Sequence, residues 1–273
     1  MLYALNAQPF NANDWDWAKP GKVFRCMNLN TNSALESVDF CVDMNIDYMM
    51  FDAGWYGLGY GQSKENNPAS NPLVVINGLD METVTNYAAA KGIGVILYVN
   101  KVAWYNYDNQ AMFDLYESWG IKGLKLGFVD GYSATGNQKV YGIIQEAANR
   151  KMLINVHDNF RPTGLIQKYP NLMTAEGVRG NEAIANTGDH NSLIPYTRML
   201  TGATDFTICY LGNDPEYKRP SSLATTRAHQ LAMSVMMYSP LQHVFWYAIP
   251  GIYHNPDEIE LFTKLPVVWD DFK

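Results

Sequence analysis

The sequence predicts an α/β fold, a (β/α)8 TIM barrel, and three observations support this class. Short apolar segments typical of buried parallel strands alternate with helical segments, and the pair recurs about eight times. The length of 273 residues suits one barrel, since such domains commonly span about 200–250 residues. No GxGxxG turn follows the first strand and no P-loop occurs, which disfavours an open nucleotide-binding sheet.

The first four strand–helix pairs have clear start and stop signals. Ser33 and Glu36 form a capping box for the first helix, while Gly92 and Gly120 end the second and third. Residues 1–20 are expected to be an extended lead-in, and residues 21–273 a single barrel. In chain order, the expected strands and helices of this half are residues 23–29, 33–44, 46–51, 80–91, 93–99, 108–119, 124–129 and 137–151.

The second half of the chain has shorter apolar runs. Ser221 is the expected cap of a long helix, and Pro240 lies just beyond its end. The expected strands of this half are residues 153–156, 172–174, 206–209 and 241–245, and the expected helices are residues 221–238 and 256–263.

Composition excludes several classes of protein. Hydrophobic residues make up 47% of the chain and charged residues 17%, which is too apolar for wholesale disorder. No apolar run reaches about 18 residues, so no membrane span is expected, and the N-terminus lacks the pattern of a signal peptide. The net charge of −7 argues against nucleic acid as a partner. We interpret Cys26, Cys41 and Cys209 as buried small hydrophobes, because their spacing matches no metal site.

Polar side chains gather at the carboxyl ends of the predicted strands, where the chemistry of a TIM barrel lies. A single acid at such a position can simply cap a helix, but acids, amides, lysines and a histidine at six strand ends favour a site. The set is Asn28, Asn30, Asp52, Trp55, Asn100, Lys101, Lys125, Asp130, His157, Asp158, Glu176, Arg179 and Glu182.

This mixture indicates sugar chemistry. Several carboxylates can divide into an acid and a base or nucleophile, and Trp55, Tyr56 and Trp104 are candidates to stack on sugar rings. The absence of a GxSxG turn disfavours an esterase, and no phosphate-binding loop supports an aldolase or isomerase.

The same carboxylates also suit a hard cation. Asp158, Glu176 and Glu182 offer oxygen ligands, and only one histidine lies nearby in the sequence. This donor set favours Ca²⁺ over Zn²⁺.

Longer motifs resemble one known family. They are WGIKGLKLGFV at residues 119–129, RPTG at 161–164 and YPNLMTAEGVRGNE at 169–182, framed by KPGKV at 19–23 and LPVVWD at 265–270. Together they resemble glycoside hydrolase family 97 across nearly the whole chain. The resemblance implies a Ca²⁺-dependent α-glycosidase acting on oligosaccharides or other α-glycosides, in the periplasm or secreted. The β-domains that flank this barrel in the family are not expected here, so exposed barrel surface is expected to meet a partner domain or a second copy.

The resemblance also implies roles for individual residues. Glu182 occupies the general-acid position and Glu176 a calcium-ligand position, while Asp158 matches a carboxylate that is base and calcium ligand in the inverting branch. Glu182 is a further candidate ligand for Ca²⁺. Together with the other strand-end residues, the expected substrate-binding set is Asp52, Trp55, Asn100, Lys125, His157 and Arg179.

Two departures from the family pattern leave alternatives open. The retaining branch carries an Asp nucleophile where this chain has Gly127, and the inverting branch has a second base where this chain has Asn100. We therefore expect inverting hydrolysis, with Glu182 as acid and Asp158 as base, of an α-glucoside in preference to an α-galactoside. The alternatives are a retaining α-galactosidase with Asp130 as nucleophile and a carbohydrate-binding barrel without turnover.

Overall fold

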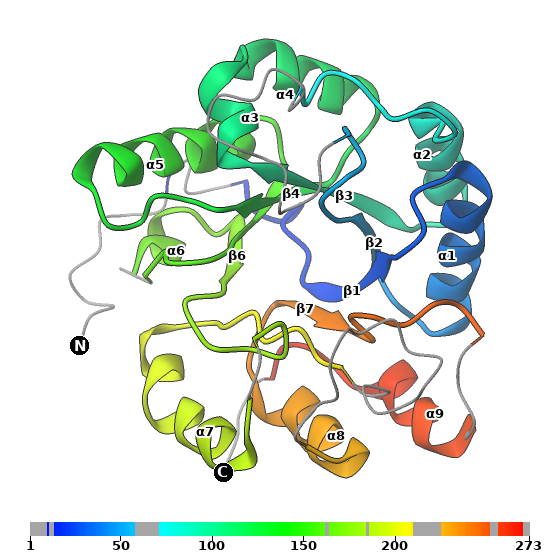
Figure 1. The fold of residues 1–273 in the computed structure, drawn as a ribbon, viewed down its shortest axis with the longest axis vertical. Helices are drawn as coiled ribbons and strands as arrows, with labels where there is room; N and C mark the ends of the chain where they lie inside the picture. Colours follow the sequence, from blue (N-terminus) through cyan, green and yellow to red (C-terminus); the bar gives the residue numbers. More distant parts are fainter. Residues whose placement is uncertain are drawn as a thin grey trace.

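The computed structural model describes residues 10, 14–57, 71–161, 164–183, 186–209, 225–251 and 256–269. Within them, parallel strands form one seven-stranded sheet in the order β6-β5-β4-β3-β2-β1-β7. Figure 1 shows the strands at the centre of the molecule with helices around them. The strands are β1 (Gly21–Cys26), β2 (Tyr48–Phe51), β3 (Gly94–Asn100), β4 (Gly123–Gly127), β5 (Leu153–Val156), β6 (Leu172–Ala175) and β7 (Leu241–Val244).

The sheet curls into a barrel because β1 pairs with both β2 and β7. The remaining gap, between β6 and β7, is filled by an irregular segment, residues 204–208, that hydrogen-bonds to both strands. The Asp205 N–H donates to the Ala175 carbonyl at 3.0 Å, and the Ile208 N–H donates to the His243 carbonyl at 3.1 Å. The predicted TIM barrel is therefore confirmed, with this segment in the seventh position and β7 in the eighth.

The strand predicted at residues 206–209 is wrong as regular structure. Thr207 has a φ of 55°, which lies in the left-handed region and breaks an extended run. Arg198, rather than a regular ladder of strand hydrogen bonds, holds this segment against β6. Its guanidinium donates to the carbonyls of Ala175 at 2.8 Å and Ala203 at 3.0 Å.

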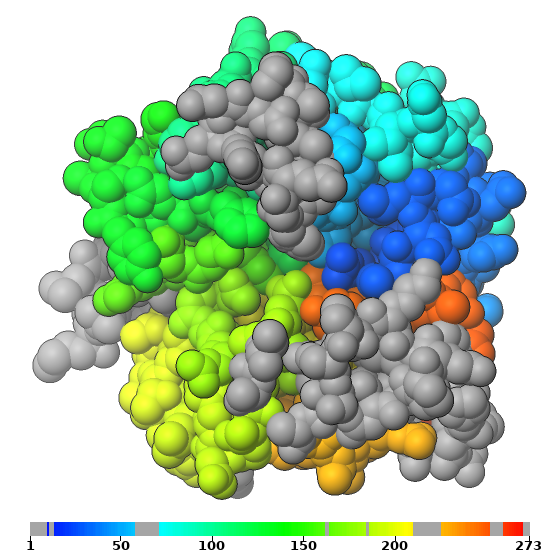
Figure 2. All heavy atoms as spheres, viewed as in Figure 1, coloured from blue at the N-terminus to red at the C-terminus, as the bar shows by residue number. Residues whose placement is uncertain are grey.

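The early, blue-to-green part of the chain occupies the upper part of the surface in Figure 2. The helices lie outside the sheet. They are α1 (Thr31–Asp43), α2 (Met81–Ala90), α3 (Lys101–Asn106), α4 (Asn109–Ser118), α5 (Ala134–Asn149), α6 (Leu165–Lys168), α7 (Gly188–Leu193), α8 (Arg227–Met236) and α9 (Pro256–Lys264), with 3-10 turns η2 (Ile194–Tyr196) and η3 (Arg198–Thr201). The short helices α3, α6 and α7 were not predicted, because four to six residues carry little periodicity.

Helix starts differ from the predicted ones at α1, α5 and α8; α5 begins at Ala134, after a Ser133 cap, rather than at residue 137. Asn30, not Ser33, caps α1, and its side chain accepts a hydrogen bond from the Ser33 N–H at 3.0 Å. The predicted capping box is therefore wrong, since the helix begins one turn earlier. The first residues of the helix predicted at 221–238 lie outside the described residues, and α8 begins at Arg227 after a Thr226 cap.

The core is continuous between the strands and the helices. Every residue of β2, β5 and β7 is buried, as parallel strands covered on both faces require. The three cysteines are buried and free, which confirms their predicted role as core residues. Among the described residues, no helix combines the length and apolarity that crossing a membrane requires.

Candidate active site

A hollow of about 290 Å³ lies at the carboxyl ends of the central strands. Its walls come from β3 and β4 and from the residues directly after β5, β6 and β7, so side chains far apart in sequence meet there. The lining residues are Tyr98, Lys125, Gly127, Phe128, His157, Asp158, Glu176, Glu182 and Tyr247. Below, this hollow is called the strand-end pocket.

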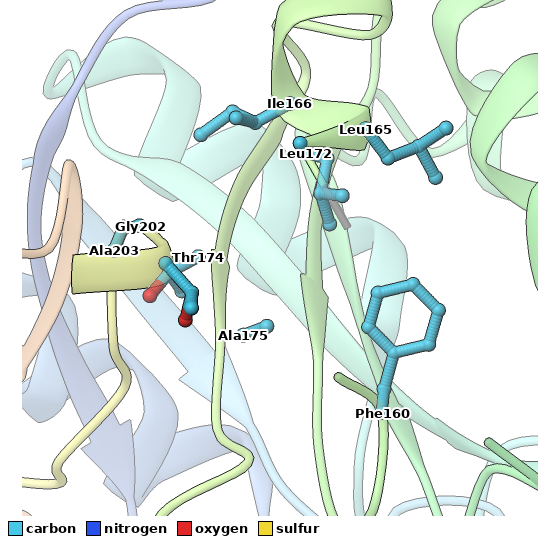
Figure 3. A pocket seen from close by; sticks show the side chains of 10 residues that line it. Phe160, Leu165, Ile166, Leu172, Thr174, Ala175, Gly202 and Ala203 are labelled. Carbon is cyan, nitrogen blue, oxygen red and sulfur yellow. The ribbon is translucent and has the colours of Figure 1, made fainter. Parts of the chain in front are cut away.

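A different pocket, drawn in Figure 3, lies at the outer side of β6. Its labelled side chains include Phe160, Leu165, Ile166 and Leu172, and its lining contains no titratable group. This pocket therefore offers no side chain for acid–base chemistry, whereas the strand-end pocket does.

Glu182 is held in the strand-end pocket by one hydrogen bond and two ion-pair contacts, each from a different element. Its Oε1 accepts a hydrogen bond from the Trp246 indole at 3.1 Å. Its Oε2 lies 3.9 Å from Lys125 Nζ and 3.6 Å from His157 Nδ1. The side chain remains 24% exposed, so a substrate can reach a carboxyl group whose orientation is already set.

Lys125 is a buried cation beneath the pocket. Its ammonium lies 3.7 Å from Asp52 and 4.1 Å from the centre of the Trp246 ring, and Arg25 contacts the same Asp52 carboxylate at 3.1 Å. Burial alone would lower the pKa of Lys125, but Asp52 and Glu182 more than offset this and raise it. Lys125 therefore stays charged and directs a fixed positive charge toward Glu182.

His157 is oriented by Asp205, a residue of the irregular segment. The Asp205 carboxylate lies 2.6 Å from His157 Nε2 and accepts a hydrogen bond from the Asn155 amide at 2.6 Å. This contact turns the other ring nitrogen, Nδ1, toward Glu176 at 3.3 Å. Burial and Lys125 lower the pKa of His157, but Glu176 and Asp205 outweigh them and raise it to about 9. The imidazolium form can therefore donate to carboxylates on both sides.

Glu176 and Asp158 are linked through the backbone. Glu176 accepts a hydrogen bond from the Asp158 N–H at 2.6 Å, and the Asp158 carboxylate accepts one from the Phe128 N–H. Asp158 and Phe128 have φ values of 64° and 54°, an uncommon conformation that is often found at functional sites. Burial raises the pKa of Glu176, and the charge of Glu182 adds to this effect against the opposing effect of His157.

Gly127 faces the ring of Tyr98 at very close range. A Cβ atom at position 127 would lie 2.2 Å from both the ring edge and the hydroxyl oxygen of Tyr98. The aromatic ring therefore fills the volume that any longer side chain at this position would need.

Comparison with known proteins gives the family. The sequence profile of the family Glycoside hydrolase 97 matches residues 15–178. The chain belongs to glycoside hydrolase family 97. This result confirms the resemblance seen in the motifs, because the matched range contains most of them.

Relatives of this family 97 barrel support the same placement. A retaining alpha-galactosidase of Bacteroides thetaiotaomicron is 28% identical over 297 residues, which cover 99% of this chain and 43% of the relative. A probable retaining alpha-galactosidase of Streptomyces bingchenggensis is 28% identical over 94% of this chain and 40% of its own length. A family 97 enzyme from Pseudoalteromonas sp. strain K8, solved in complex with acarbose, has a TM-score of 0.81 at 23% identity, covering 98% of this chain and 47% of that one. The chain thus spans less than half the length of these relatives.

The family 97 barrel brings together five of the predicted site residues. Lys125, His157, Asp158, Glu176 and Glu182 all line the strand-end pocket, as expected from their positions at strand ends. They meet because β4, β5 and β6 are neighbours in register in one parallel sheet.

Two predicted substrate contacts are buried below or beside the pocket. Trp55 is fully buried, and its indole donates to the Tyr98 carbonyl at 2.8 Å. This placement corrects its predicted role as a substrate-binding, sugar-stacking ring, because the ring packs against Tyr56 in the core. Asp52 is 1% exposed and acts through Lys125 and Arg25 rather than as a wall of the pocket.

Three further predicted residues lie away from Glu182. Asn100 caps α3 through the Val102 N–H at 2.9 Å, and Asp130 accepts a hydrogen bond from the Ser133 hydroxyl at 2.6 Å. Both line a neighbouring hollow of about 370 Å³ that also includes Asp158. Arg179 is exposed and lines neither hollow.

Sequence reasoning missed four residues that organise the site: Arg25, Tyr98, Asp205 and Trp246. Trp246 lies two residues beyond β7, and Asp205 lies in the segment that occupies the seventh position. Applying the strand-end rule to the last two positions of the barrel could have found both. Arg25 and Tyr98 lie inside strands whose apolar pattern hides an inward-facing polar group.

Proposed function

We propose that this barrel hydrolyses α-glycosidic bonds, with Glu182 as the general acid. The observation that carries the proposal is the position of Glu182, which Trp246, Lys125 and His157 hold at the edge of a pocket that Asp158 also lines. Glycosidases of most families place two carboxyl groups around the scissile bond. Glu182 and Asp158 are such a pair on two different strand ends.

The proposed reaction is a single displacement. Glu182 transfers its proton to the glycosidic oxygen as the bond from that oxygen to the anomeric carbon breaks. Asp158 takes a proton from a water molecule whose oxygen attacks the anomeric carbon from the opposite face. The products are the free sugar with inverted configuration and the protonated leaving group, and exchange with solvent restores both carboxyl groups.

The contact between Gly127 and Tyr98 supports inversion. The retaining pattern of the family needs a carboxylate at position 127, where the Tyr98 ring leaves no room. Burial, together with Tyr56, Asp52 and Asp158, raises the pKa of Tyr98, so its hydroxyl remains neutral and is a poor nucleophile.

A retaining mechanism is the second candidate, because both curated relatives carry the word retaining in their names. Its proposed nucleophile is Asp130. Against this role, Asp130 is hydrogen-bonded to Ser133 and lines the neighbouring hollow rather than the strand-end pocket.

The proposed substrate is an α-linked hexoside. Gly127 favours an α-glucoside, since the inverting α-glucosidase branch carries glycine there, and the K8 enzyme is described in complex with acarbose. An α-galactoside is the alternative, supported by the names of the curated relatives.

Proton NMR of the first-formed sugar tests this proposal. With p-nitrophenyl α-glucoside, inversion predicts that β-glucose appears before mutarotation. First-formed α-glucose would overturn inversion in favour of retention, and the same run with the α-galactoside reports the epimer preference. If neither substrate is hydrolysed, the enzyme proposal is overturned, and a barrel that binds sugar without turnover is favoured.

Glu182→Gln tests the acid separately. It should abolish hydrolysis of alkyl α-glucosides yet retain activity on α-glucosyl fluoride, whose leaving group needs no proton. The exposed Glu260→Gln is the matched control and should leave both activities unchanged.

We also propose Ca²⁺ as the cofactor, held by Glu176 and Glu182 with Asp158. The two glutamates fit a hard cation, because their carboxylate oxygens and a ring nitrogen of His157 all lie within 4.8 Å of one another; Asp158 is not in this group and is included on the family resemblance. Burial and, to a smaller extent, the charge of Glu182 raise the pKa of Glu176, and a bound cation would oppose both effects. When bound, Ca²⁺ would supply fixed positive charge beside the acid. His157 keeps its contact with Asp205 whether or not Ca²⁺ is bound.

Calorimetric titration of chelator-treated protein with Ca²⁺ tests the cofactor directly. Heat of binding and a raised unfolding temperature are expected, and Glu176→Gln should remove both. Ca²⁺ binding that is unchanged in this variant would contradict the assigned ligand, and no binding to the parent protein would contradict the cofactor.

A further inference from the structure

A second hollow lies on the flank of the barrel, among helices α3, α4 and α5, which are neighbours in the upper left of Figure 1. Its volume is about 340 Å³, comparable to that of the strand-end pocket. It shares no lining residue with the strand-end pocket or with the hollow beside Asp130. It is therefore a separate feature that the proposed hydrolysis does not use.

Aromatic rings form much of this flank hollow. Trp104 is buried, Tyr105 and Tyr107 are half-buried, and the Lys139 ammonium lies 3.6 Å from the centre of the Tyr105 ring. Tyrosine and tryptophan present an apolar face together with a polar edge. A pyranose ring has the complementary character, since one face carries C–H groups and the rim carries hydroxyls.

Two buried polar atoms at the hollow have no hydrogen-bond partner among the described residues. They are the Trp104 indole nitrogen, a donor, and the Asn109 side-chain oxygen, an acceptor. Buried polar groups are usually satisfied, so an unpaired donor and an unpaired acceptor on two residues that line one hollow need an explanation. A sugar hydroxyl both donates and accepts, and a small rotation of an exposed lining side chain such as Gln110 would admit one.

Gly142 is the third independent observation. It lies in the interior of α5, where glycine destabilises a helix relative to alanine. A Cβ atom there would meet nothing within 4 Å, so packing does not require the glycine. Its missing side chain keeps one side of the hollow open.

The charges around the hollow are already compensated. Lys139 lies over the Tyr105 ring, and Glu146 accepts a hydrogen bond from Arg150 at 2.7 Å. These contacts favour a neutral ligand over a phosphate or a carboxylate.

We propose that the flank hollow is a second saccharide-binding site, which holds a neutral pyranose unit of an oligosaccharide outside the active site. Such a site would raise the local concentration of substrate chains near the barrel. The inference does not depend on the mechanism at Glu182, because binding there requires no catalysis.

Tryptophan indole N–H signals in a two-dimensional nitrogen–proton spectrum report the two sites separately. The chain has 7 tryptophans, Trp104 lies at the flank hollow, and Trp246 contacts Glu182 in the active site. Each signal is assigned by a Trp→Phe variant. The protein titrated is the inactive Glu182→Gln variant, so that maltotetraose or raffinose stays intact.

The proposal predicts that one of these two sugars shifts the Trp104 signal in a saturable way. Gly142→Leu, which points a side chain into the open space, should reduce that shift at least tenfold and leave any Trp246 shift unchanged. Gln138→Leu, on an exposed position of the same helix, is the control and should alter neither signal. Gly142→Leu in the otherwise native chain should hydrolyse p-nitrophenyl glycosides at the parent rate.

Two outcomes would overturn the inference: no Trp104 shift with either sugar, or a Trp104 shift that persists unchanged in Gly142→Leu. Absence of a Trp246 shift would count against the proposed active site instead. The two failures are therefore distinguishable in one experiment.

Discussion

Asp205→Asn is the substitution that most directly tests how the site is organised. Asp205 is 1% exposed and contacts His157 at 2.6 Å, Asn155 at 2.6 Å and His243 at 3.0 Å. Asparagine keeps the shape but removes the charge and replaces one acceptor oxygen with a donor amide. At least one of the two contacts with histidine therefore becomes unfavourable.

The expected magnitude follows from those contacts. A hydrogen bond to a charged group contributes about 1.5–3 kcal/mol, so losing one or two of them should lower the free energy of unfolding by roughly 3 kcal/mol. His157 would lose the contact that directs Nδ1 toward Glu176 and Glu182. If one directed contact is lost from the transition state, kcat falls by about 10- to 100-fold.

The assay is steady-state kinetics on p-nitrophenyl α-glucoside beside urea unfolding. We expect kcat to fall while KM changes little, because Asp205 does not line the strand-end pocket. Ile46→Ala is the matched control: it removes a buried side chain just before β2, at the opposite end of the strands. It should cost about 2–5 kcal/mol of stability without lowering kcat at a temperature where it stays folded.

The pH dependence of the stability difference has a definite sign. Burial would raise the pKa of Asp205, but His243 and His157 hold it well below its usual range. A carboxyl group with a lowered folded-state pKa stabilises the fold above its unfolded pKa of about 3.9 and loses that contribution as the pH falls through the folded value. The stability gap between native and Asp205→Asn protein should therefore persist at neutral pH, narrow in acid, and narrow again above about pH 9, where His157 loses its proton. An Asp205→Asn protein with native kcat would refute the positioning role, even if its stability fell.

Three further predictions follow from contacts described above. Gly127→Ala should lower the free energy of unfolding by about 1–3 kcal/mol, because its Cβ would overlap the Tyr98 ring. In the double variant with Tyr98→Ala, part of this lost stability should be recovered. Additive losses of stability in urea unfolding would contradict this. Arg198→Ala should cost about 3 kcal/mol of stability by thermal or urea unfolding, because it removes charge-assisted donors to Ala175 and Ala203, and Arg227→Ala on the surface of α8 is the control. The three buried cysteines should react with a thiol reagent such as Ellman's only on unfolding, since burial raises the pKa of the thiols of Cys26 and Cys41, and rapid native reaction would show that the core opens readily.

Local sequence signals were sufficient for the elements of the first six strands. Their apolar runs are long or well bounded, so type and order of the strands could be predicted, whereas the short helices after β5 and β6 could not. The seventh position could not be predicted in the same way. Its segment is irregular, and hydrogen bonds to β6 and β7 place it, with no repeating pattern of its own.

The site residues that lie at the ends of strands could be predicted from the sequence. Lys125, His157, Asp158, Glu176 and Glu182 were expected together and lie together. The motifs alone did not show which aromatic residue faces the pocket. Trp55 is core and Trp246 contacts the acid, because the direction of a side chain beyond a strand depends on how the loop turns.

The sequence by itself determined the fold class, the family and the inventory of carboxylates, because these depend on local periodicity and on motifs that are contiguous in the chain. Only the tertiary structure decided which groups touch. Asp205 reaches His157 across 48 positions, and Trp246 reaches Glu182 across 64, because barrel closure brings the last strands beside the central ones. The charge balance around Glu182 is likewise a property of the closed barrel, since Coulomb interactions depend on distances in space and on burial, neither of which is written in any one segment.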